Sequence, residues 1–553
     1  MSTQAFHSIP QAVQAWAEQD AAKVFVRIRK RGSDERAITY AELLDKARHY
    51  CGAYQALGVR PGANVFVLLN LGEDLICSFI GAMLGGYIPS YVAPLGDKQD
   101  PAHYWKALVH QCQRIEVGVL VTSPENEAQV SALVDESRAK VLSTALLHQH
   151  FTLATPPLPD TEAIALLQHS SGTTGGHKGV ALSHRAILDQ VARYARSLRL
   201  DASDVIVSWL PLYHDMGLIS SFLTPLVTGT PLVLLDPFEW VAAPWTLLSA
   251  ITEYRGTLSW LPNFAFHFLS RAPQPAGMAI DLSSVKAFIN CSEPCKPEAF
   301  EAFEKRFAAH GVKPGQLQIC YAMAETVFAV TQTTPGEVLQ PLRVSRAGLQ
   351  QGRLMPSDDP LDERVMPVGP PLDGARVRIL GDDGQPLPEG HVGEIAISTP
   401  YMFSGYYREP ELTAAALKGE DYLSGDLGAL HQGVLYITGR KKDLIIVNGK
   451  NYYAHDVEEV ASDVAGVKAG RVVALAVPNA AMGSESVHVI AESERPEEDY
   501  ATIARDIKVG IQQTMGLLIA KAVVVPPKWL IKTTSGKMSR WGNREKYLNE
   551  NKP

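Results

Sequence analysis

The chain has 553 residues, more than one hydrophobic core usually organises, so two to four domains are expected. Apolar residues make up 46% and charged residues 20% of the sequence, as in ordinary soluble globular proteins. The 59 acidic residues outnumber the 51 lysines and arginines, for a net charge of −8. This balance argues against nucleic acid as the main partner, because phosphate backbones select basic surfaces.

The six cysteines are scattered, without the close pairs of a zinc site or the density of a disulfide framework, so reduced and buried thiols are expected. The first 20 residues include acids and lack the apolar core of a signal peptide. The most apolar long stretches, 75–96 and 209–235, are interrupted by Pro, Gly, His or Asp, which favours buried segments over membrane spans. We therefore expect a cytoplasmic protein with no transmembrane segment.

Short runs rich in Val, Ile and Leu alternate with amphipathic stretches over the first 330 residues. The strand-like runs are 65–70, 118–123, 205–212, 231–236 and 285–290. Stretches 40–57 and 183–200 have the spacing of amphipathic helices. This alternation is typical of mainly parallel sheets flanked by helices, so the sequence predicts a layered α/β body.

The pattern changes in the second half of the chain. Residues 336–367 form a polar, proline-punctuated segment that is too long for a routine connection. Strand-like runs with glycine-rich bounds then predict a small antiparallel or barrel-like region. Beyond residue 440 the pattern restarts as an α+β lobe of about 110 residues. We expect a large N-terminal domain at 1–440, built of layered α/β subdomains and the barrel-like region, and a small mobile α+β domain at 441–553.

The segment "QHSSGTTGGHKGVALSH" (168–184) combines glycines, hydroxyl side chains and Lys178 between an apolar run and a helical stretch. Glycines let successive backbone N–H groups converge on an anion, and the hydroxyls and the lysine add donors and charge, so phosphate is the expected guest. The Walker A pattern fails at two fixed positions, where His177 and Gly179 stand, which disfavours a Walker-type kinase or ATPase. Taken alone, the segment also fits a flexible polar loop without a ligand.

This loop resembles the phosphate loop of the adenylate-forming superfamily, which includes acyl-CoA synthetases, fatty acyl-AMP ligases, nonribosomal-peptide adenylation domains and luciferases. The matching residues are Ser170, Ser171, Gly172, Thr173, Thr174 and Gly175, followed by Lys178 and Gly179. Four further segments resemble the superfamily's motifs and keep its order: "YAMAET" (321–326), "YLSGDLG" (422–428), "YITGRKKDLIIVNGKNYYAHDVE" (436–458) and "IKTTSGKMSR" (531–540).

The resemblance implies ATP as substrate and gives each motif a role. Glu325 would hold Mg²⁺, with Tyr321 and Thr326 beside it in the nucleotide site. Asp426 would accept hydrogen bonds from both ribose hydroxyls, which suits a carboxylate because it only accepts. Arg440 would lie near the ribose and phosphate.

Two lysines follow in the C-terminal part. Lys442 would be the hinge, and Lys537 would reach the α-phosphate and the substrate carboxylate. From Lys521 to the end there are eight lysines or arginines against two glutamates, so this lobe can deliver a cation to an anionic site. Taken singly, Glu325, Asp426 and Lys537 would each also fit a surface or turn residue.

The implied reaction has two halves. A carboxylate attacks the α-phosphorus of ATP and pyrophosphate leaves; a thiol then displaces AMP from the acyl-adenylate. Both partners of the first step are anionic, so catalysis consists mainly of charge neutralisation and in-line positioning. Mg²⁺ on Glu325, the loop amides with Thr173 and Thr174, and Lys537 would supply it. No side-chain nucleophile is required.

The segment "LPLYHDMGL" (210–218) bears on the substrate. Amino-acid-activating members carry a Phe-Asp motif here, whose acid pairs with the substrate amine. Tyr213, His214, Asp215, Met216 and Gly217 resemble instead the fatty acyl-AMP ligases, in which this run lines the acyl entrance. A packed loop with a hydrogen-bonded His214 is the alternative.

Two more features favour the same branch. "INCSEP" (289–294) resembles its segment near the adenine, which places Ser292 and Glu293 there. The stretch from Glu325 to Gly369 matches the length of fatty acyl-AMP ligases, which carry an insertion, so 336–367 is the candidate insertion. In that branch the insertion restrains the C-terminal lobe and disfavours CoA, leaving acyl-AMP for the phosphopantetheine arm of an acyl carrier protein.

Some positions depart from the pattern. Ala322 replaces the usual glycine after Tyr321, and Cys291 with Ser292 replaces Gly-Ala at the adenine wall, whereas Ala324 agrees with the acyl-AMP ligases.

The leading prediction is a ligase that uses ATP and Mg²⁺ to activate a carboxylic, fatty acid as acyl-AMP and passes it to a carrier protein. The alternatives are a fatty or aryl acyl-CoA synthetase and a catalytically silent acyl or nucleotide sensor.

Overall fold

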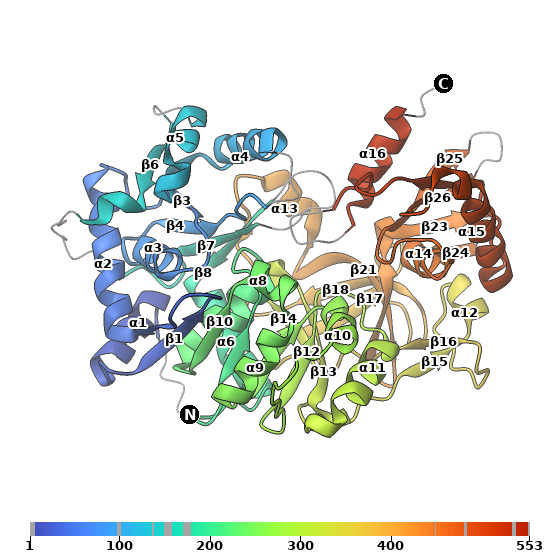
Figure 1. Cartoon of the computed structure of the whole chain (residues 1–553), viewed down its shortest axis with the longest axis horizontal. Coiled ribbons are helices and arrows are strands. Elements are labelled where there is room, and N and C mark those ends of the chain that lie inside the picture. The colour runs from blue at the N-terminus through green and yellow to red at the C-terminus, as the bar shows by residue number, and fades with distance from the viewer. Residues whose placement is uncertain are drawn as a thin grey trace.

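The computed structural model describes residues 6–96, 101–134, 138–148, 158–169, 178–447, 450–479, 484–532 and 538–550. Figure 1 shows a large body, and the last elements of the chain, α14 to α16 with β23 to β27, lie together on one side of it. The α/β fold class is confirmed: parallel sheets covered by helices form the body, and an antiparallel sheet follows them in the chain.

The largest sheet has eight strands in the order β14-β13-β12-β11-β9-β10-β1-β2. Their bounds are β1 Val24–Arg29, β2 Arg36–Thr39, β9 Ile206–Ser208, β10 Leu232–Leu235, β11 Leu258–Leu261, β12 Ala287–Asn290, β13 Leu317–Ala322 and β14 Ala329–Gln332. The six inner strands pair in parallel, and the edge strands β2 and β14 pair antiparallel. Buried inner strands such as β10, "LVLL", explain the continuous apolar runs of the sequence.

A second sheet, β4-β3-β5-β6, is entirely parallel, and a third, β19-β8-β7, is antiparallel. The bounds are β3 Asn64–Leu68, β4 Ile88–Tyr91, β5 Val117–Thr122, β6 Lys140–Ser143, β7 Ile164–His169, β8 Gly179–Ser183 and β19 Gly405–Tyr406. The fully buried strand β8 was not predicted: it forms the last part of the 168–184 segment, between the glycine-rich residues 170–177 and the following helix. These glycine-rich residues therefore connect two antiparallel strands and do not lead directly into a helix N-terminus.

Helices cover the faces of these sheets (Figure 1). Their bounds are α1 Ile9–Gln19, α2 Tyr40–Ala56, α3 Glu73–Leu84, α4 Pro101–Ile115, α5 Pro124–Leu133, α6 His184–Ser197, α7 Thr224–Thr228, α8 Pro237–Ala242, α9 Trp245–Tyr254, α10 Asn263–Arg271 and α11 Pro297–Phe307. In α6 the Ser183 hydroxyl accepts from the Ala186 amide at 3.1 Å, which caps the helix. The buried face of α6 includes Tyr194, whose hydroxyl accepts from Trp260 Nε1 at 2.7 Å.

The third architectural element is the five-stranded antiparallel sheet that the sequence predicts as a barrel-like region. It consists of β17 Arg376–Leu380, β18 Gly393–Ser398, β20 Leu417–Lys418, β21 Asp421–His431 and β22 Val434–Arg440, with α13 Pro410–Ala416 beside it. Asp426 on β21 stands opposite Arg440 on β22 in the register of the sheet. The register thus brings two predicted site residues together.

The remaining elements are β15 Leu342–Val344, α12 Arg346–Gln350, β16 Glu363–Val365, β23 Leu444–Val447, β24 Lys450–Tyr453, α14 Ala454–Ser462, β25 Val472–Asn479, β26 Ser484–Glu492, α15 Tyr500–Met515, β27 Lys521–Val525 and α16 Arg540–Glu550. The candidate insertion contains the pair β15–β16 and α12, which lie next to α14 and α15 in Figure 1. The residues after 444 have hydrophobic clusters of their own, centred on Val457, Ile507 and Val473. The boundary at 440/441 and the mobility of the lobe stay predictions.

All six cysteines are free, and five are buried while Cys295 is half-buried. Within the described ranges, no helix combines the length and apolar character that a membrane crossing requires.

His184, the first residue of α6, makes the stability of the protein depend on pH. Its side chain is 2% exposed, Nδ1 accepts from the Ile9 amide at 3.3 Å, and burial lowers its pKa to about 4. Since an unfolded histidine titrates near 6.5, the unfolded chain binds more protons between pH 6.5 and 4, and stability is lost as the pH falls through this window. In urea unfolding, the loss of unfolding free energy between pH 7 and pH 5 should be about 2 kcal/mol smaller in His184→Gln than in the unchanged protein. Equal losses would contradict this assignment.

Candidate functional site

Three predicted site residues meet at the middle of β21. The Tyr321 hydroxyl donates to Asp426 Oδ2 at 2.7 Å, and Arg440 Nε lies 3.0 Å from Asp426 Oδ1. Asp426 is 7% exposed, and its charge raises the pKa of Arg440 above the ordinary arginine value. Each oxygen of this carboxylate retains further lone pairs, so it can accept more hydrogen bonds from a ligand.

Two lysines add positive charge beside this group. The protein surrounding the Lys442 ammonium, together with the charge of Arg440, lowers the pKa of Lys442 to about 8, although Asp443 and Asp426 act in the opposite direction. Lys178, which follows the glycine-rich segment, is near enough to lower that pKa too. Its Nζ lies 4.4 Å from the centre of the Tyr406 ring, a cation–π contact. The predicted hinge residue and the predicted loop lysine therefore share one cationic region.

Glu325 lies in a neighbouring, more enclosed position. It is 9% exposed, its Oε1 accepts from the Tyr406 hydroxyl at 2.7 Å, and its carbonyl oxygen accepts from the Phe403 amide at 2.9 Å. Tyr406 belongs to β19, which pairs with β8 directly after the glycine-rich segment. Glu325 is thus held beside the strand that leaves the candidate phosphate loop.

The segment 213–217 begins an unusual helix. His214 Nδ1 lies 2.7 Å from Asp215 Oδ1, whose oxygen also accepts from the Met216 amide at 2.7 Å. Residues Met216–Leu223 then form a π-helix, a geometry that is often found at functional sites. Gly217 is required here, because a Cβ atom would come within 2.2 Å of the Pro211 carbonyl oxygen.

This segment contacts both strand β7, which precedes the glycine-rich loop in the chain, and the predicted adenine wall. Gln168 Nε2, near the end of β7, donates to the Tyr213 carbonyl oxygen at 3.0 Å. The Ser292 hydroxyl is 3.9 Å from Met216 Sδ, and Ser292 has a φ of 73°, which is unusual for a residue other than glycine. The segment 213–217 is therefore joined to the end of β7 and to Ser292.

Two other predicted residues have their side chains engaged within the protein. Glu293 Oε2 accepts from the Phe264 amide at 3.1 Å in the first turn of α10. Thr326 is fully buried, and its hydroxyl donates to the Phe328 carbonyl oxygen at 3.0 Å. In this structure Glu293 binds the start of helix α10, and Thr326 supports a local turn. The predicted roles of Ser170, Ser171, Gly172, Thr173, Thr174, Gly175 and Lys537 concern positions outside the described residues.

Comparison with known proteins identifies the family. The family model described as AMP-binding enzyme matches residues 13–407. The chain belongs to the AMP-binding enzyme family. This confirms the resemblance to adenylate-forming enzymes that the five motifs indicated.

Among relatives of this AMP-binding enzyme, long-chain-fatty-acid–AMP ligase FadD32 of Mycolicibacterium smegmatis is 29% identical, over 98% of this chain and 94% of its own length. The medium-chain-fatty-acid–[acyl-carrier-protein] ligase JamA of Moorena producens is 28% identical, over 96% and 93% of the two chains. A solved structure from studies of fatty acyl-adenylate ligases of E. coli and L. pneumophila aligns with a TM-score of 0.91 and 26% identity, over 100% of this chain and 99% of that chain. The chain is thus similar in sequence and shape to fatty acyl-AMP ligases.

The residues around Glu325 fit the Mg²⁺ that the family's use of ATP implies. Among the described residues, no group of three or more His, Cys, Asp or Glu side chains is arranged to hold a metal ion. One enclosed carboxylate agrees with Mg²⁺ chemistry, because Mg²⁺ on a nucleotide is commonly held by one or two carboxylates, phosphate oxygens and water. Glu325 is the residue of this AMP-binding enzyme that suits that role.

The sequence analysis missed the two tyrosines next to Glu325. Tyr406 donates to its carboxylate, and Tyr422 is close enough to Glu325 and Tyr406 that burial and these neighbours raise its pKa strongly. For Tyr406 the signal was present as "YMFSGYY" (401–407), an aromatic stretch outside every motif used for the prediction, whereas Tyr422 is the first residue of the motif "YLSGDLG" and was given no role. Tyr406 orients the carboxylate of this AMP-binding enzyme through its hydrogen bond, and Tyr422 lies close to the pair.

Asp426→Asn should weaken ATP binding. The change preserves size but leaves Arg440 without its counter-charge and reduces the accepting capacity offered to a ribose. Because hydrogen bonds to charged groups contribute about 1.5–3 kcal/mol, KM for ATP should rise about 10- to 100-fold in acid-dependent ATP–pyrophosphate exchange.

Asp421→Asn is the matched control, because Asp421 lies on the same strand, is 5% exposed and pairs with Arg378, which is not a predicted site residue. Its KM for ATP should stay within about twofold of the unchanged protein, a difference below about 0.5 kcal/mol. Similar increases in both variants would mean that Asp426 acts through the stability of the sheet alone.

Proposed function

We propose that this chain is an AMP-forming acid–thiol ligase that activates a fatty acid as acyl-AMP and transfers the acyl group to the phosphopantetheine thiol of an acyl carrier protein. The observation that carries the proposal is the meeting of Tyr321, Asp426 and Arg440 around one carboxylate. These residues come from three motifs: Asp426 and Arg440 lie on the paired strands β21 and β22, and Tyr321 lies about 100 residues earlier in the chain. A diol-accepting carboxylate flanked by cations is the arrangement that a nucleotide requires.

The chemistry follows from the charges. In the first half-reaction the substrate carboxylate attacks the α-phosphorus of ATP, the P–O bond to pyrophosphate breaks, and acyl-AMP forms. Asp426 orients the ribose, while Arg440, Lys178 and Lys537 offset negative charge on the phosphates. Mg²⁺, held by Glu325, neutralises phosphate charge when it is bound. Tyr406 keeps the Glu325 carboxylate in place.

In the second half-reaction a thiolate attacks the acyl carbon, and AMP leaves with the carboxyl oxygen that it had received. No protein nucleophile takes part, which agrees with the free cysteines. In this proposal the segment 213–217, which contacts Gln168 and Ser292, borders the acyl chain where it approaches the α-phosphate. The contacts of 213–217 favour this role because they join it to the strand that precedes the predicted phosphate loop and to the predicted adenine wall.

The candidate insertion supports a carrier protein as acceptor. Arg346 Nη1, in the insertion, donates to the Thr514 carbonyl oxygen near the end of α15 at 3.1 Å. This contact ties the insertion to the C-terminal elements in the arrangement that the structure adopts. We propose that it limits the lobe movement that CoA would need. The relative JamA is named as a ligase of medium-chain fatty acids and acyl carrier protein, which is consistent with this acceptor.

The experiment that tests the proposal supplies purified protein with ATP, Mg²⁺ and a panel of medium-chain, long-chain and aryl acids. Each reaction receives either a holo-acyl carrier protein or CoA. AMP and acylated carrier should form with a fatty acid, and acyl-CoA should form slowly or not at all. Robust acyl-CoA formation would refute the carrier assignment, and the absence of AMP would refute the function.

An acyl-CoA synthetase is the second candidate. A relative from Caulobacter vibrioides, named "Putative acyl-CoA synthetase", is 29% identical over 94% of this chain and 91% of its own length. An acyl-CoA synthetase would carry out the same adenylation half-reaction as the first candidate. The choice of thiol in the experiment above separates the two.

A further inference from the structure

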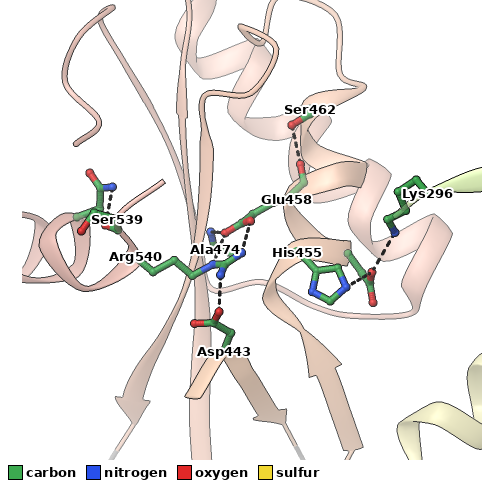
Figure 2. Close-up of polar contacts among 10 residues, drawn as sticks. Lys296, Asp443, His455, Glu458, Ser462, Ala474, Ser539 and Arg540 are labelled. Atoms are coloured by element: carbon green, nitrogen blue, oxygen red, sulfur yellow. Dashed lines mark hydrogen bonds and ion pairs between the residues drawn. The ribbon is translucent and has the colours of Figure 1, made fainter. Parts of the chain in front are cut away.

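Helix α14 joins the body of the protein to the C-terminal motif. On one side of the helix, Lys296 Nζ lies 2.9 Å from Glu459 Oε2 and 3.8 Å from Asp456 Oδ1. Lys296 directly precedes α11, so it belongs to the body and reaches across to a helix beyond the predicted hinge. Figure 2 shows its ammonium pointing toward α14 beside His455.

The contact is partly shielded from water: the Glu459 side chain is 53% exposed, and the rest of the contact is more enclosed. The side chains of Lys296 and Asp456 are 25% and 18% exposed, and Asp456 Oδ1 is also 3.1 Å from His455 Nε2. Burial opposes the charge of Lys296, yet Asp456, Glu459 and Glu363 together raise its pKa above the ordinary lysine value. Within this cluster, loss of Lys296 would remove the positive charge that lies among Asp456 and Glu459 of α14 and Glu363 of β16.

The other side of α14 holds the end of the C-terminal motif. Both oxygens of Glu458 accept from Arg540, from Nε at 2.8 Å and from Nη2 at 2.6 Å, and Arg540 Nη1 donates to Asp443 Oδ2 at 2.5 Å (Figure 2). A two-pronged contact of this kind fixes orientation as well as distance. Asp443 immediately follows Lys442, whose ammonium lies near Asp426.

Arg540 is three residues past Lys537 in the sequence. Three residues span at most about 11 Å, so the position of Arg540 limits where Lys537 can reach. The chain of contacts therefore runs from Lys296 in the body, through α14, to the residue that anchors the C-terminal motif. It ends beside the predicted hinge and ribose site.

We propose that Lys296 is a positioning residue for the adenylation half-reaction: by binding Asp456 and Glu459 it docks α14 on the body in the arrangement that brings the C-terminal motif to the nucleotide site. The inference rests on the proposed function, because it assigns the docked arrangement to acyl-AMP formation. The rate of that half-reaction should be proportional to the docked fraction of molecules. Acyl transfer, which does not need Lys537, should be independent of this contact.

Two variants test the proposal. Lys296→Met removes the charge and keeps the length of the side chain, and Lys296→Glu adds a fourth acid to the cluster. Dodecanoate-dependent ATP–pyrophosphate exchange should fall about 3- to 10-fold in the first variant and at least about 10-fold in the second, in proportion to the docked fraction. Transfer from synthetic dodecanoyl-AMP to pantetheine should change less than about twofold in both, below about 0.5 kcal/mol.

Lys305→Met is the matched control, because Lys305 is an exposed lysine near the end of the same helix α11. It should leave both half-reactions unchanged. The double variant Lys296→Glu/Glu459→Lys restores an opposite-charge pair and should recover at least about half of the lost exchange. Such rescue separates docking from a general loss of stability.

Equal losses in exchange and transfer, unchanged exchange in Lys296→Glu, or an unrescued double variant would each overturn the proposal. These outcomes leave the proposed function intact as long as the unchanged protein forms acyl-AMP. If the unchanged protein shows no acid-dependent exchange, the proposed function itself fails. The two failures are therefore distinguishable in one set of assays.

Discussion

Lys537→Ala is expected to abolish acid-dependent ATP–pyrophosphate exchange while acyl transfer from supplied acyl-AMP continues. Only the first half-reaction brings two anions together, so only that step requires the ammonium to offset charge at the α-phosphate. Removing one preorganised donor from such a transition state costs about 10²- to 10³-fold in rate. Exchange should therefore fall by at least this factor, and thioester formation by less than about twofold, or 0.5 kcal/mol.

Lys532→Ala is the control for the loss of positive charge in the tail, because Lys532 is an exposed lysine of the same motif. It should retain most of the exchange activity. Equal loss of the two half-reactions in Lys537→Ala would show that the lysine supports the fold of the lobe and has no role specific to the α-phosphate.

Glu325→Gln is expected to shift the Mg²⁺ dependence of the exchange reaction. The substitution keeps the shape of the side chain and can still accept the Tyr406 hydrogen bond, but it removes the negative charge that a hard cation requires. The Mg²⁺ concentration for half-maximal exchange should rise by at least about tenfold, which corresponds to about 1.4 kcal/mol.

Tyr406→Phe separates charge from orientation. This variant keeps the Glu325 carboxylate and loses only the 2.7 Å hydrogen bond that orients it, so its shift in Mg²⁺ dependence should be smaller. If Glu325→Gln responds to Mg²⁺ as the unchanged protein does, Glu325 does not bind the metal.

The sequence predicts the α/β body well because its strands are continuous apolar runs. β10 and β12 fall inside predicted runs, and α2 and α6 coincide with the predicted helical stretches to within a few residues. Strand β8 was missed because its five residues follow a glycine-rich segment, and its pairing with β7 and β19 depends on the tertiary structure. Local patterns contain no information about a partner such as β19, which lies more than 200 residues further along the chain.

The functional site also contains residues that local motifs predict and residues whose contacts depend on the tertiary structure. Asp426, Arg440 and Tyr321 were predicted from motifs, and the sheet register with one hydroxyl contact brings them together. The Tyr406–Glu325 bond spans 81 positions and involves a tyrosine that no motif marked. Lys296 is similar: nothing in the sequence near it indicates that α14 lies opposite. Such contacts depend on how the elements pack, and periodicity and motifs describe only what is local.

Oxygen-18 transfer is the most direct test of the central claim that one nucleotide site joins a carboxylate to the α-phosphorus of ATP. The protein is incubated with ATP, Mg²⁺, a holo-acyl carrier protein and dodecanoate labelled in both carboxyl oxygens, and the AMP is analysed by mass spectrometry. We predict one oxygen-18 atom in each AMP formed, because the attacking oxygen stays on phosphorus when the thiol takes the acyl group. AMP without the label, or ADP and phosphate in its place, would contradict the account.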